Sequence, residues 1–175
     1  MEGDNVSGAA NQQERPLVAQ WVVGFVDGEG CFSVPIFRNR SCRLGWQVQP
    51  EFAVVQGGRS VQVLYGLERF FGCGSVDVNL RHDNHREDVW RYHVRRFSEL
   101  ANRIVPFFEA NPLRTAKRGD FAAFATVIGL MEARAHLSEG GLREIADVAA
   151  TMNRRKRSEL VESSEAIRQP SHLDG

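Results

Sequence analysis

The alternation of apolar and polar residues predicts a buried helix followed by two strands. Apolar residues fill most positions from Leu17 to Val26, which is typical of a helix covered on several sides, and Pro16 suits the first helical position. After this helix, apolar residues recur at every second position. Residues 31–38 and 46–56 therefore read as strands, with Pro50 marking an edge or a bulge in the second.

A second helix and two further strands follow. Ser60 is a suitable N-cap for a helix that runs through Phe71 and is ended by Gly72. Residues 74–81 and 88–96 then alternate between apolar and polar positions, with a polar turn between them. The pattern thus repeats the helix–strand–strand order of the first part of the chain.

The rest of the chain reads as helical. Ser98 is expected to cap a short helix that Pro106 breaks. Longer helices are expected over 120–135 and 138–152, and a short amphipathic helix up to Arg168.

This order of elements predicts an α+β fold. Strands joined by short connections form an antiparallel sheet, and the helices are expected to cover its apolar face. The outward-facing positions of all four predicted strands are polar or basic. The other face of the sheet is therefore expected to be open to a ligand.

Length and composition place the chain among globular proteins. Its 175 residues, 42% hydrophobic and 25% charged, suit a single domain. We expect a disordered arm over 1–15, one domain over 16–168 and a loose tail over 169–175. The polar N-terminus is not a secretory signal, and no apolar run is long enough for a membrane span. Three cysteines, odd in number and without metal spacing, favour a reduced intracellular protein.

The charge distribution favours a nucleic-acid partner, although the net charge is zero. Residues 31–118 hold 14 basic and eight acidic residues, a balance of +6, whereas both flanking segments are acidic. A basic middle segment is typical of nucleic-acid binding but does not distinguish DNA from RNA. No loop of the GxxxxGK[ST] type and no zinc-spaced Cys/His set supports a kinase or a zinc enzyme.

Two carboxylates, Asp27 and Glu29, close the first predicted helix within the segment VVGFVDGEG (22–30). Acids at this end of a helix face the negative end of its dipole, so their placement needs a reason. The segment resembles the LAGLIDADG motif of homing endonucleases, and PLRTAKRGDF and MNRRKR follow at suitable distances. The resemblance covers residues 16–168 and implies the αββαββα fold of that family, with an antiparallel DNA-binding sheet.

The resemblance also implies a catalytic set. The second acid of the motif holds a divalent metal in this family, so Glu29 is the expected metal ligand and catalytic residue, with Mg²⁺ as the ion and Mn²⁺ as a substitute. Family members often have aspartate there, but glutamate keeps the hard oxygen ligand that Mg²⁺ prefers. Gln56 matches the position that orients the attacking water. Lys117 matches the active-site lysine, with Arg114 and Arg118 as open alternatives.

A single motif copy implies a homodimer in which two motif helices pack together. The expected interface consists of Trp21, Gly24, Phe25 and Gly28, because small residues four apart let another backbone come close. Asp27, the first acid of the motif, is expected to pack at the helix end. Twofold symmetry predicts a long pseudo-palindromic site in double-stranded DNA, with each copy hydrolysing one strand.

Outward strand residues and a basic loop are the expected DNA contacts. Arg and Gln suit the edges of guanine and adenine, whereas Asp and Glu can accept from cytosine. The candidates in the strands and their connections are Ser33, Arg38, Asn39, Arg40, Gln47, Gln49, Glu51, Ser75, Asp77, Asn79, Arg81, Arg91 and His93. The basic loop contributes Arg154, Arg155, Lys156 and Arg157, which would add affinity rather than sequence reading.

Two other functions fit the same scaffold. One is an RNA-binding maturase whose partner is the host intron RNA, and the other is a DNA-binding protein that does not cleave. The combination of Glu29, Gln56 and Lys117 favours cleavage, because a pure maturase does not need it, and the intact acid pair argues against the protein that does not cleave. A mobile group I intron as the host element, in the bacterial cytoplasm or an organelle, is implied by the family alone, and the target sequence is not readable from the chain.

Overall fold

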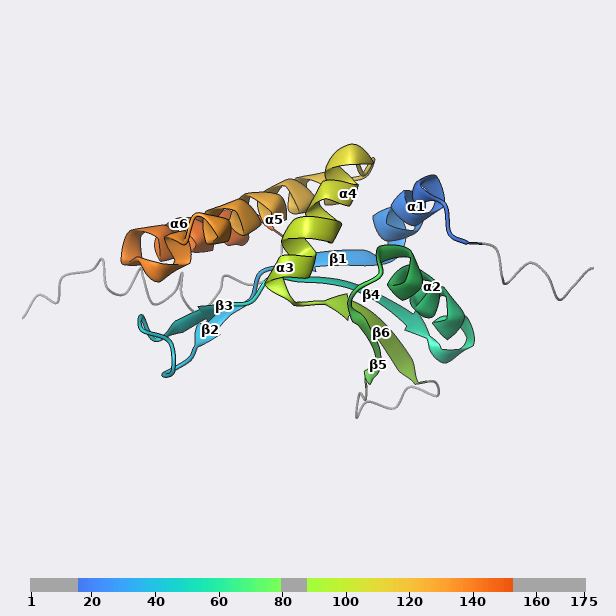
Figure 1. Ribbon diagram of the computed structural model, residues 1–175, viewed down its shortest axis with the longest axis horizontal. Helices are drawn as coiled ribbons and strands as arrows, with labels where there is room; N and C mark the ends of the chain where they lie inside the picture. The colour runs from blue at the N-terminus through green and yellow to red at the C-terminus, as the bar shows by residue number, and fades with distance from the viewer. Residues whose placement is uncertain (1–15, 80–87, 153–175) are drawn as a thin grey trace, which may run out of the picture.

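The computed structural model describes residues 16–79 and 88–152 (Figure 1). In chain order its elements are α1 (Ala19–Glu29), β1 (Gly30–Ser33), β2 (Ile36–Arg38), β3 (Trp46–Val48), β4 (Glu51–Gly57), η1 (Gly58–Ser60), α2 (Val61–Phe71), β5 (Ser75–Asn79), β6 (Val89–Val94), α3 (Phe97–Glu99), η2 (Leu100–Ile104), α4 (Val105–Ala110), α5 (Lys117–Glu132), η3 (Ala135–Leu137) and α6 (Glu139–Ala150). The predicted α+β class and the order of its elements are confirmed.

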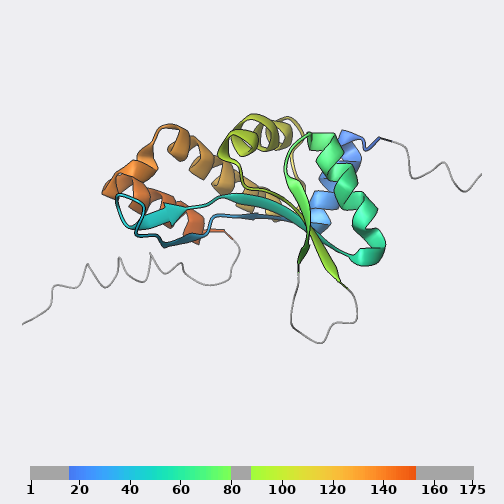
Figure 2. The same cartoon turned by 60° about the horizontal axis from the view of Figure 1, so that its bottom comes forward.

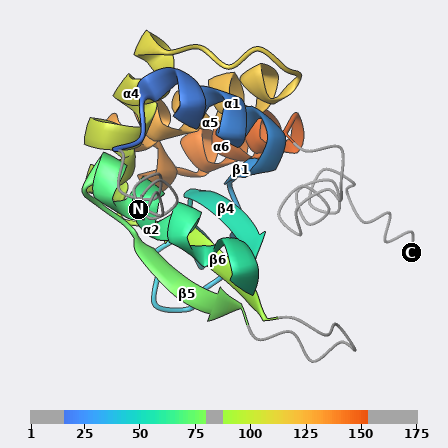
Figure 3. The same ribbon diagram turned by 90° about the vertical axis from the view of Figure 1, so that its right-hand side faces the viewer.

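An antiparallel sheet of four strands, in the order β1-β4-β6-β5, forms the base of the domain. Gly30 pairs with Val54, and Val54 pairs in turn with Tyr92, so β4 and β6 are the central strands. Figure 1 shows α4, α5 and α6 above one face of this sheet, and α1 and α2 beside one end. Viewed from that end, α1 lies in front of α5 (Figure 3).

The structure divides each of the first two predicted strands into two. Pro35 separates β1 from β2, and Pro50 separates β3 from β4. A proline has no N–H for a ladder hydrogen bond, so each strand is interrupted there. The outer halves pair as a separate hairpin of β2 and β3, which the alternation pattern did not predict. The hairpin is tied to the helical layer at its tip, where the Arg43 guanidinium donates to the carbonyl of Leu137.

Aromatic side chains form the centre of the core. Phe32 on β1 stacks on Phe52 on β4 with 5.0 Å between ring centroids, and Phe108 of α4 lies edge-on to both. Tyr92 of β6 is fully buried, and its hydroxyl donates to the carbonyl of Cys73 at 3.0 Å. Burial and this hydrogen bond raise the pKa of Tyr92. The helix-facing side of the sheet is therefore sealed by apolar packing.

Helical turns follow one another without interruption over 97–110, so the predicted break at Pro106 is wrong. The middle of this segment, η2, is a π-helical turn in which the N–H of Val105 donates to the carbonyl of Leu100, five residues back. This wider turn ends at Ile104, two residues before Pro106, which has no N–H and whose ring would clash in a regular helix. Ser98 is not the cap either, because the helix already begins at Phe97 and has no side-chain cap.

Other predicted helix boundaries are confirmed only in part. Gly72 ends α2 with a positive φ of 61°, and the hydroxyl of Ser138 accepts from the N–H of Gly141 at 3.1 Å at the start of α6. Ser60 occupies the N-cap of α2 without making a side-chain bond. The first helix begins at Ala19 rather than at Pro16.

The face of the sheet opposite the helices, here called the outer face, is free of other described elements and comes forward in Figure 2. Pairing register and side-chain alternation assign to it Cys31, Ser33, Glu51, Ala53, Val55, Ser75, Asp77, Arg91 and His93. Within the described ranges, no helix is long and apolar enough to cross a membrane.

Candidate active site

Asp27 joins the end of α1 to the loop that precedes α5. Its carboxylate accepts from the backbone N–H groups of Arg114 and Thr115, at 2.9 and 3.2 Å, and from the Thr115 hydroxyl at 2.8 Å. Partial burial raises the pKa of Asp27, but these hydrogen bonds and the charge of Lys117 outweigh it, so the pKa lies below its usual value. The ionised carboxylate therefore fixes the loop at Arg114 and Thr115, which directly precedes Lys117.

Replacing Asp27 with asparagine should loosen this loop. Neutral amide oxygen accepts more weakly than carboxylate, so we expect the free energy of unfolding to fall by about 1 kcal/mol at pH 7. Because the pKa of Asp27 is lowered in the folded protein, its contribution is present above pH 3.8 and is lost as the pH falls through the folded pKa. Urea unfolding of both proteins across pH 3 to 7 checks this. A difference that grew toward low pH would contradict it.

Lys117 is the first residue of α5 and reaches back to the end of α1. Its Nζ donates to the carbonyl of Val26 at 2.8 Å, near the negative end of the α1 dipole. Its backbone N–H donates to the Thr115 hydroxyl at 3.3 Å. Partial burial lowers the pKa of Lys117, while Cys31, Asp27 and Glu29 are among the groups that oppose this. The helix begins three residues before the predicted start at Asp120, and this extra turn places the ammonium group beside the motif.

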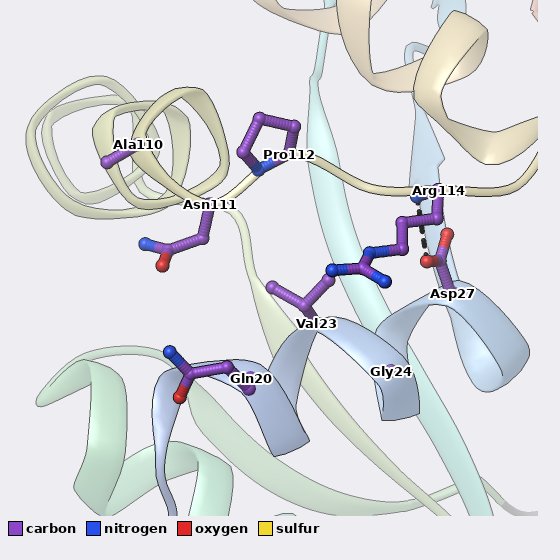
Figure 4. Close-up of a pocket in the computed structure, with 8 residues that line it drawn as sticks. All are labelled: Gln20, Val23, Gly24, Asp27, Ala110, Asn111, Pro112 and Arg114. Atoms are coloured by element: carbon purple, nitrogen blue, oxygen red, sulfur yellow. Dashed lines mark hydrogen bonds between the residues drawn. The ribbon is translucent and has the colours of Figure 1, made fainter.

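The two alternative cations are placed differently. Arg114 lies along an open pocket of about 440 Å³, and its side chain points back over α1 toward Val23 and Gly24 (Figure 4). Arg118 is exposed on α5. Of the three basic residues, Lys117 is thus the one with a side-chain bond to the end of α1. The pocket itself is not lined by Glu29, Gln56 or Lys117.

Glu29 ends α1 with an exposed carboxylate. Within the described ranges it has no hydrogen bond or ion pair, so its oxygens are available to a cation. No group of three or more His, Cys, Asp or Glu side chains gathers anywhere in residues 16–79 and 88–152, as an all-protein metal site would require. Mg²⁺ commonly binds through one or two carboxylates together with phosphate oxygens and water. The available carboxylate fits a metal of that kind.

Gln56 lies near the same helix end. It stands two residues beyond Val54 on one face of β4, and Val54 pairs with Gly30, the first residue after α1. The side chain is half-buried. Glu29, Gln56 and Lys117 thus come from three elements toward one end of α1, although no side-chain hydrogen bond links them among the described residues.

Glu51 was a candidate for base reading, but the structure does not support a direct base contact. Its side chain is buried although it belongs to the outer face, with a residue exposure of 5%. The carboxylate forms ion pairs with Arg91 and with Arg95, the latter at 2.6 Å between Oε2 and Nε. Oε2 accepts a hydrogen bond from Arg95, whereas Oε1 is buried without a hydrogen bond and is compensated by the ion pair with Arg91.

Other candidates on the outer face remain accessible. Ser75 and Asp77 are exposed, and Asp77 Oδ2 lies 3.6 Å from Nδ1 of His93. Partial burial and the charge of Arg95 lower the pKa of His93, against the opposing effect of Asp77. Ser33 is half-buried at the end of β1, opposite Glu51.

The β2–β3 hairpin carries a second group of candidates. The Arg38 guanidinium lies over the Trp46 ring, 4.7 Å from its centroid. Asn39 donates to the side chain of Gln47 at 2.6 Å, and Arg40 is exposed at the tip. Gln49 lies at the base, where its N–H donates to the carbonyl of Pro35. For Asn79 only the backbone is described, and Arg81, Arg154, Arg155, Lys156 and Arg157 lie outside the described residues.

One face of α1 is apolar and uncovered. Trp21 is 41% exposed and stacks on Phe25 with 4.8 Å between ring centroids. A Cβ added at Gly24 or Gly28 would have no atom within 4 Å, so these glycines are not required for packing against the chain's own sheet. In the single chain α1 is buried through Val22, Val23 and Val26, so the rest of its predicted burial would have to come from another surface.

Two contributors to the site were missed by sequence reasoning. Thr115 bonds to Asp27 from 88 residues away, and no periodic signal reports such a contact. Arg95 pairs with Glu51, 44 residues away, although its alternation with Arg91 and His93 already assigned it to the outward side.

Comparison with known proteins identifies the family. The family model described as LAGLIDADG endonuclease matches residues 22–128, which run from within α1 through the sheet and α4 into α5. The chain belongs to the LAGLIDADG endonuclease family. The resemblance noted in VVGFVDGEG is thereby confirmed.

Solved structures confirm the LAGLIDADG homing endonuclease fold. The crystal structure of the homing endonuclease I-TnaI shares 44% identity and a TM-score of 0.79, covering 87% of this chain and 99% of that one. The meganuclease I-SmaMI bound to cleaved DNA shares 31% identity and a TM-score of 0.77, covering 91% of this chain and 51% of that one. I-SmaMI is also known bound to uncleaved DNA in the presence of calcium ions.

Curated relatives of this LAGLIDADG chain are longer. The Neurospora crassa protein named "Probable intron-encoded endonuclease 3" is 33% identical over 138 residues, which are 78% of this chain and 25% of that protein. This chain therefore spans about a quarter of that relative's length.

Proposed function

We propose that this LAGLIDADG protein is a site-specific endonuclease that cuts double-stranded DNA as a homodimer and requires a divalent metal, with Mg²⁺ as the ion and Mn²⁺ as a substitute. The observation that carries the proposal is the end of α1. There an exposed Glu29 carboxylate makes no hydrogen bond or ion pair with the described residues, while the Lys117 ammonium donates to the Val26 carbonyl. An acid that can hold a metal ion and a cation that can contact phosphate oxygens, both at one helix end, suit the hydrolysis of a phosphodiester.

The outer face supports DNA as the substrate. Most of its positions are polar and it carries Arg91, with exposed basic residues on the neighbouring hairpin. A surface of this kind suits an extended polymer better than a small molecule. The structures of I-SmaMI bound to cleaved and to uncleaved DNA, both 31% identical to this chain, support the same substrate class.

The proposed reaction is hydrolysis at phosphorus. Water attacks the phosphate in line, the bond from phosphorus to the 3′ oxygen breaks, and a 5′-phosphate remains. Glu29 would hold the metal, which supplies Lewis-acid stabilisation of the reacting oxygens when bound. Gln56 would orient the water through its side-chain amide. Lys117 would stabilise the negative charge that develops on the phosphate oxygens.

The uncovered face of α1 supports the homodimer. Trp21 and Phe25 expose apolar area, and Gly24 and Gly28 border open space, so a second α1 can approach closely. Two copies related by a twofold axis would bring two Glu29 carboxylates to the centre, one for each DNA strand. A match that covers half of the longer I-SmaMI chain is what one copy of a duplicated fold would produce.

Cleavage of a randomised duplex library tests the proposal. The purified protein is incubated with the library in Mg²⁺, Mn²⁺, Ca²⁺ or EDTA, and the newly formed ends are sequenced. We expect discrete, nearly palindromic sites with 5′-phosphate ends in Mg²⁺ and Mn²⁺, and none in EDTA. Binding without cleavage under every condition would refute the endonuclease and favour a DNA-binding protein, and binding of structured RNA alone would favour a maturase.

The proposed role of Lys117 predicts how cleavage depends on pH. Since the pKa of Lys117 is lowered from 10.5, its charge is lost at a lower pH than that of a free lysine. The single-turnover rate should therefore fall as the pH rises toward 10. In Lys117→Arg the charge persists, because guanidinium does not titrate in this range, and the fall should disappear. A wild-type rate that rose over the same range would contradict this role of the charged lysine.

A further inference from the structure

A buried acid lies within the outer face. Glu51 is the only charged residue that is buried in residues 16–79 and 88–152, and it begins β4, one of the two central strands. A carboxylate removed from water is strongly destabilising unless cations and hydrogen bonds compensate it. Here the compensation comes from two arginines, Arg91 on the neighbouring strand β6 and Arg95 directly after its last residue.

The two arginines reach Glu51 from different distances. The pairing of Phe52 with Val94 places Arg95 directly opposite Glu51 when the ladder is extended by one residue. Arg91 starts opposite Val55, so its side chain has to run back along the strands to reach the carboxylate. The residue it passes on β4 is Ala53, whose short side chain leaves room for the arginine. The ion pair between Arg91 and Glu51 therefore depends on three positions of the outer face, Arg91, Ala53 and Glu51.

Both arginines also reach solvent. The Arg91 side chain is 30% exposed and the Arg95 side chain 45%, whereas the Glu51 side chain is 7% exposed. A guanidinium has five N–H donors, so a carboxylate engages some of them and leaves others for a second partner. Glu51 thus lies beneath two cations that present their remaining donors on the outer face.

We propose that Glu51 is a positioning residue for DNA reading: it holds Arg91 and Arg95 in fixed orientations so that they contact base edges rather than the nearest phosphates. The inference rests on DNA binding by the outer face, as proposed above. An arginine without an anchor keeps its rotamer freedom and is drawn to phosphate, a contact that carries no sequence information. Anchored by a buried carboxylate, its planar fork is already aimed, and a bidentate contact to guanine requires such aim.

Two substitutions of Glu51 distinguish the effect of arginine orientation from the effect of the local charge. Glu51→Gln removes the negative charge and the ion pairs, whereas Glu51→Asp keeps the charge but is one methylene too short to hold both arginines. Glu109→Gln is the matched control, because Glu109 is an exposed acid on α4 in the helical layer. Thermal unfolding of each protein identifies any variant that does not fold.

Binding is measured without cleavage, with Ca²⁺ in place of Mg²⁺. Each protein selects from a randomised duplex library, and affinity for one fixed scrambled duplex is measured between 50 and 200 mM salt. Selection of sites by the wild type tests DNA binding itself, so its failure is distinguishable from failure of the inference. The comparison among variants then tests Glu51 alone.

We expect both folded variants to lose preference at the same base pairs, with a drop of about tenfold or more in the ratio of selected-site to scrambled affinity. Glu51→Gln should also bind the scrambled duplex several-fold more tightly, with a steeper salt dependence, whereas Glu51→Asp should not. The control should match the wild type. A Glu51→Asp protein that folds and selects the wild-type sites with undiminished preference would overturn the inference, as would weakened binding to all duplexes alike.

Discussion

Changing Glu29 to glutamine is expected to lower the single-turnover rate of DNA cleavage by about 10³-fold or more. The amide keeps the size and one oxygen of the side chain but removes the negative charge that would hold the metal. Because the change also removes an acid that would face phosphate, affinity for the target should be unchanged or slightly higher. Cleavage and binding of the selected site, measured in Mg²⁺ and in Ca²⁺ respectively, check both expectations.

A matched control is available for this substitution. Glu132 ends α5 with an exposed carboxylate, as Glu29 ends α1, so Glu132→Gln relieves the same unfavourable contact with a helix dipole. Its cleavage rate should equal that of the wild type. Normal cleavage by Glu29→Gln would refute the metal role, and equal losses in both variants would indicate a general effect on helix ends.

Replacing Gly24 with leucine is expected to abolish dimerisation without harming the folded chain. A Cβ at this position meets nothing within 4 Å in the single chain, and leucine is a better helix former than glycine by about 0.8 kcal/mol. The same side chain would separate two α1 helices that pack at this glycine. We therefore expect monomers in sedimentation, a normal circular dichroism spectrum and a loss of double-strand cleavage of about 10²-fold or more.

Gly129→Leu provides the comparison. Gly129 lies inside α5, is exposed and likewise has no atom within 4 Å of an added Cβ. This variant should gain helix stability and remain dimeric and active. A Gly24→Leu protein that still sedimented as a dimer would move the interface away from this face of α1.

The apolar pattern predicted the helix and strand order because each element follows its own period locally. Leu64, Leu67 and Phe71 face the core as the helical spacing requires, and Gly72 ends their helix with a positive φ. The two carboxylates of the motif were recognisable for the same reason, since they are neighbours in sequence. Features that depend on residues close together in the sequence could therefore be predicted.

Features that depend on distant residues were not. Alternation assigned Glu51 to the outward side, but its burial follows from Arg91 on β6 and Arg95 just after that strand. Likewise the early start of α5 follows from bonds between Asp27 and the loop at Thr115, 88 residues later. The π-helical turn before Pro106 keeps the helix continuous where local rules predict a break. In each case a long-range contact or a backbone rearrangement overrides the local preference.

The most direct test of the account is strand-resolved cleavage by mixed dimers. Wild-type and Glu29→Gln chains, carrying different tags, are co-refolded, and the dimer with one chain of each kind is isolated and given a duplex labelled on both strands. If each copy supplies Glu29 for one strand, mixed dimers should nick one strand of each duplex and leave the other intact. Mixed dimers that cut both strands, or neither, would contradict the central claim that two Glu29 sites act separately at the paired ends of α1.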